Sequence, residues 1–227
     1  MVNVNGISGA YWKLSLCATG ESVSESEARE ELKEVLLERV GSAVLLRNPI
    51  GTLKRKGSLL VEAPPDAPPV IHASNSAVNV LGVSGPVRVA ASHARAKILN
   101  TSGQVSAMAV VVDFAGSRGE VDLSADAEIN LKMTGARFSG RLMAWAQHSV
   151  RMLVPPCFTS SFRAIVNRPE DFVCQADFCG KVKLETQKYR HVFRYEGEDE
   201  ASKDPVIRLR SEEATVVIYG TDRVGKR

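Results

Sequence analysis

Four cysteines are the first residues whose type and spacing could support chemistry: Cys17, Cys157, Cys174 and Cys179. Cys174 and Cys179 lie five positions apart with no histidine at ligand spacing, so a zinc site is not expected. Alternation puts Cys174 on one face with Ala176 and Phe178, which predicts a buried structural thiol. Because 17 residues separate Cys157 from Cys174, the two could instead stack on parallel strands about 4.8 Å apart. A disulfide between Cys157 and Cys174 is therefore the alternative to a buried free thiol.

The run 188–195 interleaves basic and aromatic side chains, as surfaces that bind nucleic acids or glycans do. In a strand, the aromatic side chains would share one face and the basic side chains the other. This pattern favours a strand that covers the edge of a sheet. The alternative is a binding strand, whose candidate contacts are Tyr189, Arg190, Phe193 and Arg194.

Six basic residues stand between apolar neighbours that we expect to point inward, so the basic side chains should point outward: Arg88, Lys132, Arg151, Lys183, Arg208 and Arg210. If their strands stack on one face, they form a basic stripe that could bind an acidic surface polymer or a partner protein. The simpler interpretation is that outward positions only need soluble side chains. Glu120 and Asp122 should also point outward, and their negative charges would reduce the positive charge of the stripe.

The remaining polar residues do not form a recognisable active site. Carboxylates and histidines are scattered without a cluster that could act on a polysaccharide. The segment 220–226 has the spacing of a phosphate-binding loop, but no Ser or Thr follows Lys226 and the chain ends there. We therefore expect no catalytic residues, no cofactor and no metal, and a carbohydrate-active enzyme is the least favoured function.

The whole-chain composition limits the class of protein. The net charge of +3 is too small to favour nucleic acid as a partner. No apolar run approaches the roughly 18 to 20 residues that span a bilayer. The first residues of the chain do not have the basic, apolar and small-residue regions expected of a secretory leader. Its location is therefore the cell envelope or another extracytoplasmic site if a leader was removed, and the cytoplasm otherwise.

The elements that would position these residues are short strands separated by glycine turns. Gly85, Gly103, Gly119 and Gly140 follow one another at intervals of 18, 16 and 21 residues. Such internal similarity predicts stacked units that bury their apolar faces against their neighbours. We therefore predict an all-β fold over 70–220, a single-stranded right-handed β-solenoid or β-roll of short irregular coils. Its inward residues would be Val87, Val89, Ala91, Ile98, Val105, Val110, Val112, Val121, Leu123, Ile129, Leu131, Met133, Val150, Met152 and Val154.

The flanking segments predict smaller elements. Residues 1–62 would form a strand–helix–strand cap, with strands at 10–18, 43–47 and 58–62. Its helix would begin at the capping box Ser24–Glu27 and end near Gly41. The proline-rich segment 63–69 would be a connector, and 221–227 a basic tail. Towards the C-terminus, 173–178 and 181–186 would be two strands around Gly180.

Three groups of residues resemble the bacterial putative-adhesin family, β-solenoid domains of unknown function. They are the phrases Ser84-Gly85-Pro86-Val87 and Ser102-Gly103-Gln104-Val105, the strand Val150-x-Met-x-Val154-Pro155, and the closing Ile207-x-Leu-x-Ser211 with Thr215-x-Val-x-Ile218. The resemblance covers residues 70–220. It implies a non-catalytic structural or interaction module associated with a bacterial envelope, and an oligomer is compatible with it.

The bactofilin filament proteins have similar Gly-x-Val phrases, and this second resemblance implies a self-assembling cytoskeletal scaffold. The helical lead-in, the irregular coils and the acidic loop 196–204 depart from that pattern. All three features should hinder end-to-end stacking.

Overall fold

The computed structural model describes residues 2–6, 13–19, 24, 26, 36–40, 43–47, 56–64, 68–74, 77–187, 189–197 and 206–221. These residues form β-strands and two short 3-10 helices, so the predicted all-β class is confirmed. The elements are β1 (Val2–Gly6), β2 (Lys13–Thr19), β3 (Leu36–Val40), β4 (Ala43–Arg47), β5 (Lys56–Ala63), β6 (Val70–Ser74), β7 (Val78–Leu81), β8 (Val87–Leu99), β9 (Gln104–Gly116), β10 (Arg118–Met133), β11 (Ser139–Ala146), β12 (Ser149–Val154), β13 (Phe162–Val166), η1 (Pro169–Asp171), β14 (Phe172–Gln175), η2 (Asp177–Lys181), β15 (Lys183–Gln187), β16 (Arg190–Tyr195), β17 (Ile207–Ser211) and β18 (Val216–Gly220).

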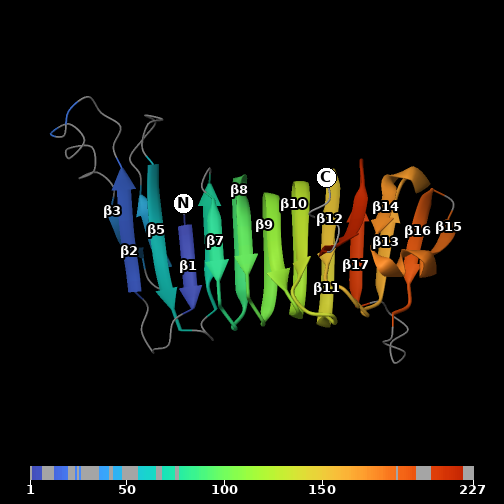
Figure 1. Cartoon of the computed structure of the whole chain (residues 1–227). Coiled ribbons are helices and arrows are strands. Elements are labelled where there is room, and N and C mark those ends of the chain that lie inside the picture. Colours follow the sequence, from blue (N-terminus) through green and yellow to red (C-terminus); the bar gives the residue numbers. More distant parts are fainter. Residues whose placement is uncertain are drawn as a thin grey trace.

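Sixteen of these strands belong to one sheet, and β3 and β4 form a separate pair. Figure 1 shows the strands side by side in an elongated array, with β2 and β5 towards one end and β15 and β16 at the other. The main path through the sheet is β15-β16-β13-β17-β11-β10-β9-β8-β7-β1-β5-β2. Most pairs are parallel, and the antiparallel pairs of this path lie at its two ends.

The three long strands β8, β9 and β10 divide the sheet into two rows. Their pairing register shifts between Ala91 and Arg95 in β8 and between Ala125 and Glu128 in β10. Before the shift they pair with β6 and β11, and this first row continues through β17 and β13 to β16 and β15. After the shift they pair with β7 and β12, and this second row continues through β18 to β14.

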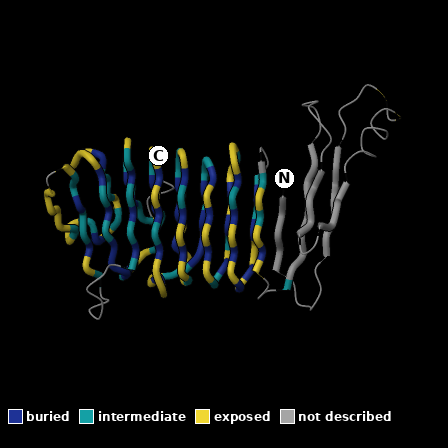
Figure 2. Tube along the Cα trace, turned by 180° about the vertical axis from the view of Figure 1, so that it is seen from behind, coloured by how far each residue is buried: buried dark blue, intermediate teal, exposed yellow. Residues whose placement is uncertain are grey.

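Both rows bury alternate side chains in one apolar core. Figure 2 shows buried and exposed positions alternating along the central strands, among them β8, β9 and β10. Every residue predicted to point inward is buried except Val110, which is half-buried. The last inward position of the first row carries a small side chain on each of four successive strands, where the chain turns towards the second row: Ala91, Ala109, Ala125 and Ala146.

The glycines that mark the sequence intervals lie against one another. A Cβ at Gly103 would come 2.4 Å from the carbonyl oxygen of Ser84, and one at Gly119 would come 2.6 Å from that of Gly103. A Cβ at Gly140 would come 2.4 Å from the carbonyl oxygen of Gly119. These distances leave no room for a side chain, so the close approach of successive turns requires glycine.

The predicted N-terminal helix is wrong at its C-terminal end. Residues 36–40 form strand β3, paired antiparallel with β4. Two apolar stretches separated only by Gly41 and Ser42 suit a hairpin, and this local pairing overrides the helical spacing of Leu36 and Val40. The rest of the predicted helix, apart from Ser24 and Ser26, lies outside the described residues.

The strands predicted in the N-terminal segment are present, and the structure adds one strand that was not predicted. The strands predicted at 10–18, 43–47 and 58–62 correspond to β2, β4 and β5. Strand β1 was not predicted, and it pairs parallel with both β5 and β7. Through β1, the N-terminal strands continue the large sheet. The division at 63–69 into a cap and a main module stays a prediction, and the tail beyond Thr221 lies outside the described residues.

Near the C-terminus, the two strands predicted around Gly180 are interrupted by a 3-10 helix. Strand β14 ends at Gln175, and η2 occupies Asp177–Lys181 before β15 begins. Phe178 on η2 is buried against Phe158, Phe162 and Tyr195. A helical turn can direct this aromatic side chain into the end of the core, which explains the interruption.

No helix in the described part of the chain is long and apolar enough to cross a membrane.

We expect Gly140→Ala to lower the free energy of unfolding by about 1–3 kcal/mol, because its φ of 112° is strained for alanine and the new Cβ would meet the Gly119 carbonyl. Urea unfolding of the variant should show a lower midpoint. The matched control is Gly180→Ala, where no heavy atom lies within 4 Å of the added Cβ. Equal midpoints for the two variants would contradict the stacked turns.

Candidate functional site

The six residues of the predicted basic stripe are divided between the two rows. Arg88, Arg208 and Arg210 lie on first-row strands, and Lys183 joins that row through β16. Lys132 and Arg151 lie on second-row strands instead. Because both rows turn their inner faces to one core, their outward side chains face opposite sides. The predicted single stripe of six is therefore not formed.

A different set of cations shares one register line of the first row. Arg208 on β17 is level with Arg163 on β13, Arg163 with Arg194 on β16, and Arg194 with Lys183 on β15. We call these four residues the arginine line. Neighbouring strands lie about 4.8 Å apart, so four cations follow one another across four strands.

The side chains of the arginine line point away from the core. The residues on both sides of Arg163, Phe162 and Ala164, are fully buried, as are the neighbours of Arg208. Val192 lies on the outer side of β16 and is nevertheless fully buried. Since Arg194 and Arg190 flank it along the strand, we infer that their aliphatic stems cover it.

Carboxylates compensate the arginine line only in part. Lys183 Nζ lies 3.1 Å from Glu196 Oε1, and Arg194 Nε lies 3.6 Å from Glu185 Oε1. No carboxylate within the described ranges pairs with Arg163. The Nε atoms of Arg163 and Arg194 are buried without a hydrogen-bond partner. Packing of neighbouring side chains in register accounts for this burial and concentrates positive charge on the outer face.

The same register line continues across the rest of the first row. Beyond Arg208 its members are Met143, Asp122, Ser106, Arg88 and Val70. Arg88 is thus level with the arginine line but separated from it by three strands, one of which carries the carboxylate Asp122. The arginine line is consequently a local feature at the C-terminal end of the row.

Glu212 connects the next register line to the turn after β17. Its Oε1 accepts a hydrogen bond of 3.1 Å from Trp145 Nε1 and pairs with the guanidinium of Arg210. Trp145 and Arg210 are direct neighbours on β11 and β17. Glu212 thus holds an exposed indole ring and a guanidinium side by side.

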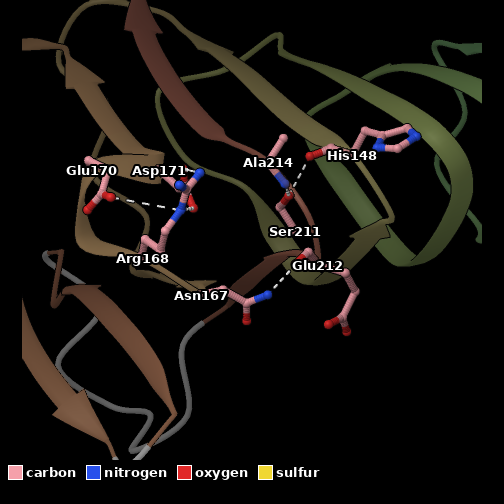
Figure 3. A network of polar contacts seen from close by, with 8 residues as sticks. All are labelled: His148, Asn167, Arg168, Glu170, Asp171, Ser211, Glu212 and Ala214. Carbon is pink, nitrogen blue, oxygen red and sulfur yellow. Dashed lines mark hydrogen bonds and ion pairs between the residues drawn. The ribbon is translucent and has the colours of Figure 1, made fainter.

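A network of polar contacts holds the turn that carries Glu212, as Figure 3 shows. Asn167 Nδ2 donates to the Glu212 carbonyl oxygen, and Ser211 Oγ donates to the His148 carbonyl oxygen. The Ala214 N–H in turn donates to Ser211 Oγ at 3.3 Å. Glu213 accepts from Gln147 Nε2 at 2.8 Å. The turns after β11, β13 and β17 are therefore joined at one edge.

Arg168 and Asp171 close the turn after β13. Arg168 donates to the two Asp171 oxygens at 3.1 and 3.0 Å, and Asp171 itself is buried. The hydrogen bond to Asp171, and then the charges of Asp171 and Glu170, raise the pKa of Arg168 above its ordinary value. This arginine stays protonated and structural.

The aromatic residues of the basic–aromatic strand pack against the end of the core. Phe193 stacks on Phe172 with ring centroids 4.0 Å apart, and Tyr195 stacks on Phe178 at 4.6 Å. Arg194 points to the opposite face, as the alternation predicts, and Arg190 shares its parity. Tyr189 lies in the turn before β16 and is 78% exposed. The geometry supports edge packing by Phe193 and leaves the basic residues outside.

The predicted environment of Cys174 is wrong. Cys174 forms a disulfide with Cys179, with their Cα atoms 5.7 Å apart, and is only half-buried. Cys157 is an exposed free thiol with a φ of 58°, so the Cys157–Cys174 pair is not formed. The reason is η2, whose tight turn brings Cys179 back to Cys174. Across the described residues, no three His, Cys, Asp or Glu side chains gather to hold a metal ion.

Sequence reasoning missed Arg163 and Trp145. Arg163 stands between inward residues as the predicted stripe residues do, so its outward direction could have been found. Its place beside Arg194 could not, because it depends on the antiparallel register of β13 and β16.

The chain was compared with family models, curated proteins and solved structures. No family model matches the chain, and no curated protein matches it. Among solved structures, it is similar to a putative cell adhesion protein from Clostridium sporogenes, at 8% identity and a TM-score of 0.31, over 96% of this chain and 86% of that one.

We expect the Cys174–Cys179 disulfide to form under oxidising conditions. A tryptic digest without reductant should contain the peptide 164–181 with a mass lower by two hydrogen atoms. Replacing both cysteines by serine should lower the free energy of unfolding by about 2 kcal/mol, because the short cross-linked loop is released. Cys157→Ser is the control and should leave peptide 164–181 unchanged. Two free thiols in that peptide after air oxidation would contradict the pairing.

Proposed function

We propose that this chain is a non-catalytic interaction module, an adhesin-like β-solenoid of a bacterial envelope, that binds an acidic polymer through the arginine line. The proposal rests on one observation: four cations lie level with one another on neighbouring strands and on one outer face. They are Arg208, Arg163, Arg194 and Lys183. The six residues of the predicted stripe do not share a face, so the proposal rests on this local set.

The energetics of like charges support an anionic partner. Two unit charges about 5 Å apart repel by roughly 1 kcal/mol in bulk water, and by more where solvent is partly excluded. Lys183 has a carboxylate at 3.1 Å and Arg194 has one at 3.6 Å, whereas Arg163 pairs with no carboxylate of the described residues. A polymer with several negative groups would relieve this repulsion at several strands at once, and guanidinium groups suit carboxylate, sulfate and phosphate oxygens.

The pairing register supports the solenoid assignment. In β8, β9 and β10 each strand lies parallel to the next one along the chain in both rows, with a register shift where it turns. Each such pair of half-strands is one coil of the proposed solenoid. The stacked glycines at Gly103, Gly119 and Gly140 are the turns between successive coils.

The Cys174–Cys179 disulfide supports a location outside the reducing cytoplasm. Disulfides persist in secreted proteins, in the periplasm and at cell surfaces, and are rare in the cytosol. A cell-envelope site fits both this disulfide and a partner that is an acidic surface polymer.

Self-assembly into filaments is the competing function, because the end of the sheet has an unpaired side. Strand β15 pairs only with β16 among the described strands, and its five residues are all exposed. However, β15 and β16 run antiparallel, unlike the stacked coils, and Lys183 and Glu185 place charges on the edge. Charged edges of this kind oppose strand-to-strand association, which favours display over filament formation.

We expect the double variant Arg163→Gln/Arg194→Gln to bind dextran sulfate at least about 10-fold more weakly than the unchanged protein, because each arginine supplies charge-assisted hydrogen bonds. Affinity of the unchanged protein should fall linearly on a log–log plot against salt concentration, as counterions are released. Isothermal titration calorimetry at several salt concentrations measures both effects.

The matched control is Lys132→Gln/Arg151→Gln, which removes the same charge from the opposite face. Its affinity for dextran sulfate should stay within about two-fold of the unchanged protein. Equal losses in the two double variants would mean that net charge, and not the arginine line, governs binding. Absence of binding to any acidic polymer would overturn the proposed function.

We also expect a compact species whose size does not change with protein concentration, since the β15 edge opposes association. Light scattering over a wide concentration range, at low and high salt, measures this. Growth into long particles would instead favour the filament function.

A further inference from the structure

We infer that the acidic polymer is a polysaccharide and that Trp145 is the residue on which one of its sugar rings stacks. This inference rests on the proposed function, because it extends the arginine line by the next register line of the same outer face. That line runs through Met108, Ser124, Trp145 and Arg210.

Trp145 presents an apolar ring where an apolar residue is not needed for folding. Its neighbours along β11, Ala144 and Ala146, point into the core and are buried, so the indole is on the outer face. It is 41% exposed, and Met108 on the same line is 58% exposed. Between them stands the short side chain of Ser124. Together they form an apolar shelf that adjoins Arg210.

The indole is oriented before any ligand arrives. Trp145 Nε1 donates to Glu212 Oε1 at 3.1 Å, and the same carboxylate pairs with Arg210. The turn that carries Glu212 is held by Asn167 and Ser211. A fixed ring loses little conformational freedom on binding, which is a property of binding platforms. Its polar edge is already satisfied, so the face is the part left to contact a ligand.

The surrounding charges favour a polysaccharide over a nucleic acid. Asp122 and Glu120 are exposed on β10, one strand from Trp145 and on the same face. These carboxylates can accept hydrogen bonds from sugar hydroxyls, of which a polysaccharide presents several on each ring. The shelf also has one exposed aromatic ring, while single-stranded nucleic acids stack successive bases on several.

The same shelf argues against an acidic peptide as the ligand. Extended peptides bind mainly through backbone hydrogen bonds at a free sheet edge. Trp145 lies on β11, which is flanked on both sides by β10 and β17 and offers no free edge. A ring-bearing polymer with spaced negative groups matches both the apolar shelf and the adjoining arginine line.

Trp145→Ala tests the inference with three probes: dextran sulfate, poly-L-glutamate and oligothymidylate. We expect the variant to lose about five-fold in affinity for dextran sulfate, since an aromatic contact is removed, and to bind poly-L-glutamate unchanged. Dextran sulfate should also change the tryptophan fluorescence of the unchanged protein, and this change should be absent in Trp145→Phe. The control Leu184→Ala removes an exposed apolar side chain away from the shelf and should leave all affinities unaltered.

The outcomes separate this inference from the proposed function. If no acidic polymer binds, the proposed function fails. If all three bind and Trp145→Ala weakens none of them selectively, the arginine line stands and the sugar-stacking role of Trp145 is overturned. Tighter, Trp145-dependent binding of oligothymidylate would replace the polysaccharide by a single-stranded nucleic acid.

Discussion

The parallel register of the hydrogen bonds is the constraint on which the other features of this structure depend. Because residues of successive strands lie level with one another, every inward position becomes a column of core residues and every outward position a column of surface residues. Inward columns are filled by Val, Ile, Leu and Phe, and they narrow to alanine where the chain turns. The same hydrogen bonds that align these columns align the cations of the outer face.

Alignment explains how an ordinary surface composition produces a local concentration of charge. The net charge of the chain is only +3, and several outward cations of the described residues lie near a carboxylate, as Arg151 lies near Glu128 and Arg95 near Asp113. At β17, β13 and β16, however, three arginines fall on one line, and one of them, Arg163, has no carboxylate partner in the described part of the chain. The position of the charges, rather than their number, makes this face locally positive.

Local alternation predicted the core well and the site poorly. Whether Val121 or Met152 points inward depends only on its neighbours in the sequence, and both are buried as expected. Which outward residues become neighbours depends on register across strands far apart in the chain. Arg163 and Arg208 are separated by 45 positions, and Trp145 and Glu212 by 67. Alternation could not distinguish the first row from the second, so Lys132 and Arg151 were grouped with cations of the opposite face. The helix expected before Gly41 failed at 36–40 for a related reason, since short apolar runs fit either period.

The antiparallel strands β16 and β15 fix the length of the first row. A parallel array can grow by duplication of a coil, because each new coil presents the same edge as the last. Beyond β13 the chain direction reverses at β16 and reverses back at β15, so the row ends in two antiparallel pairs and not in a further parallel pair. If a strand were gained or lost among β8, β9 and β10, then β17, β13, β16 and β15 would shift together along the sheet. Evolution could thus lengthen or shorten the distance between Arg88 and the arginine line without altering the line itself.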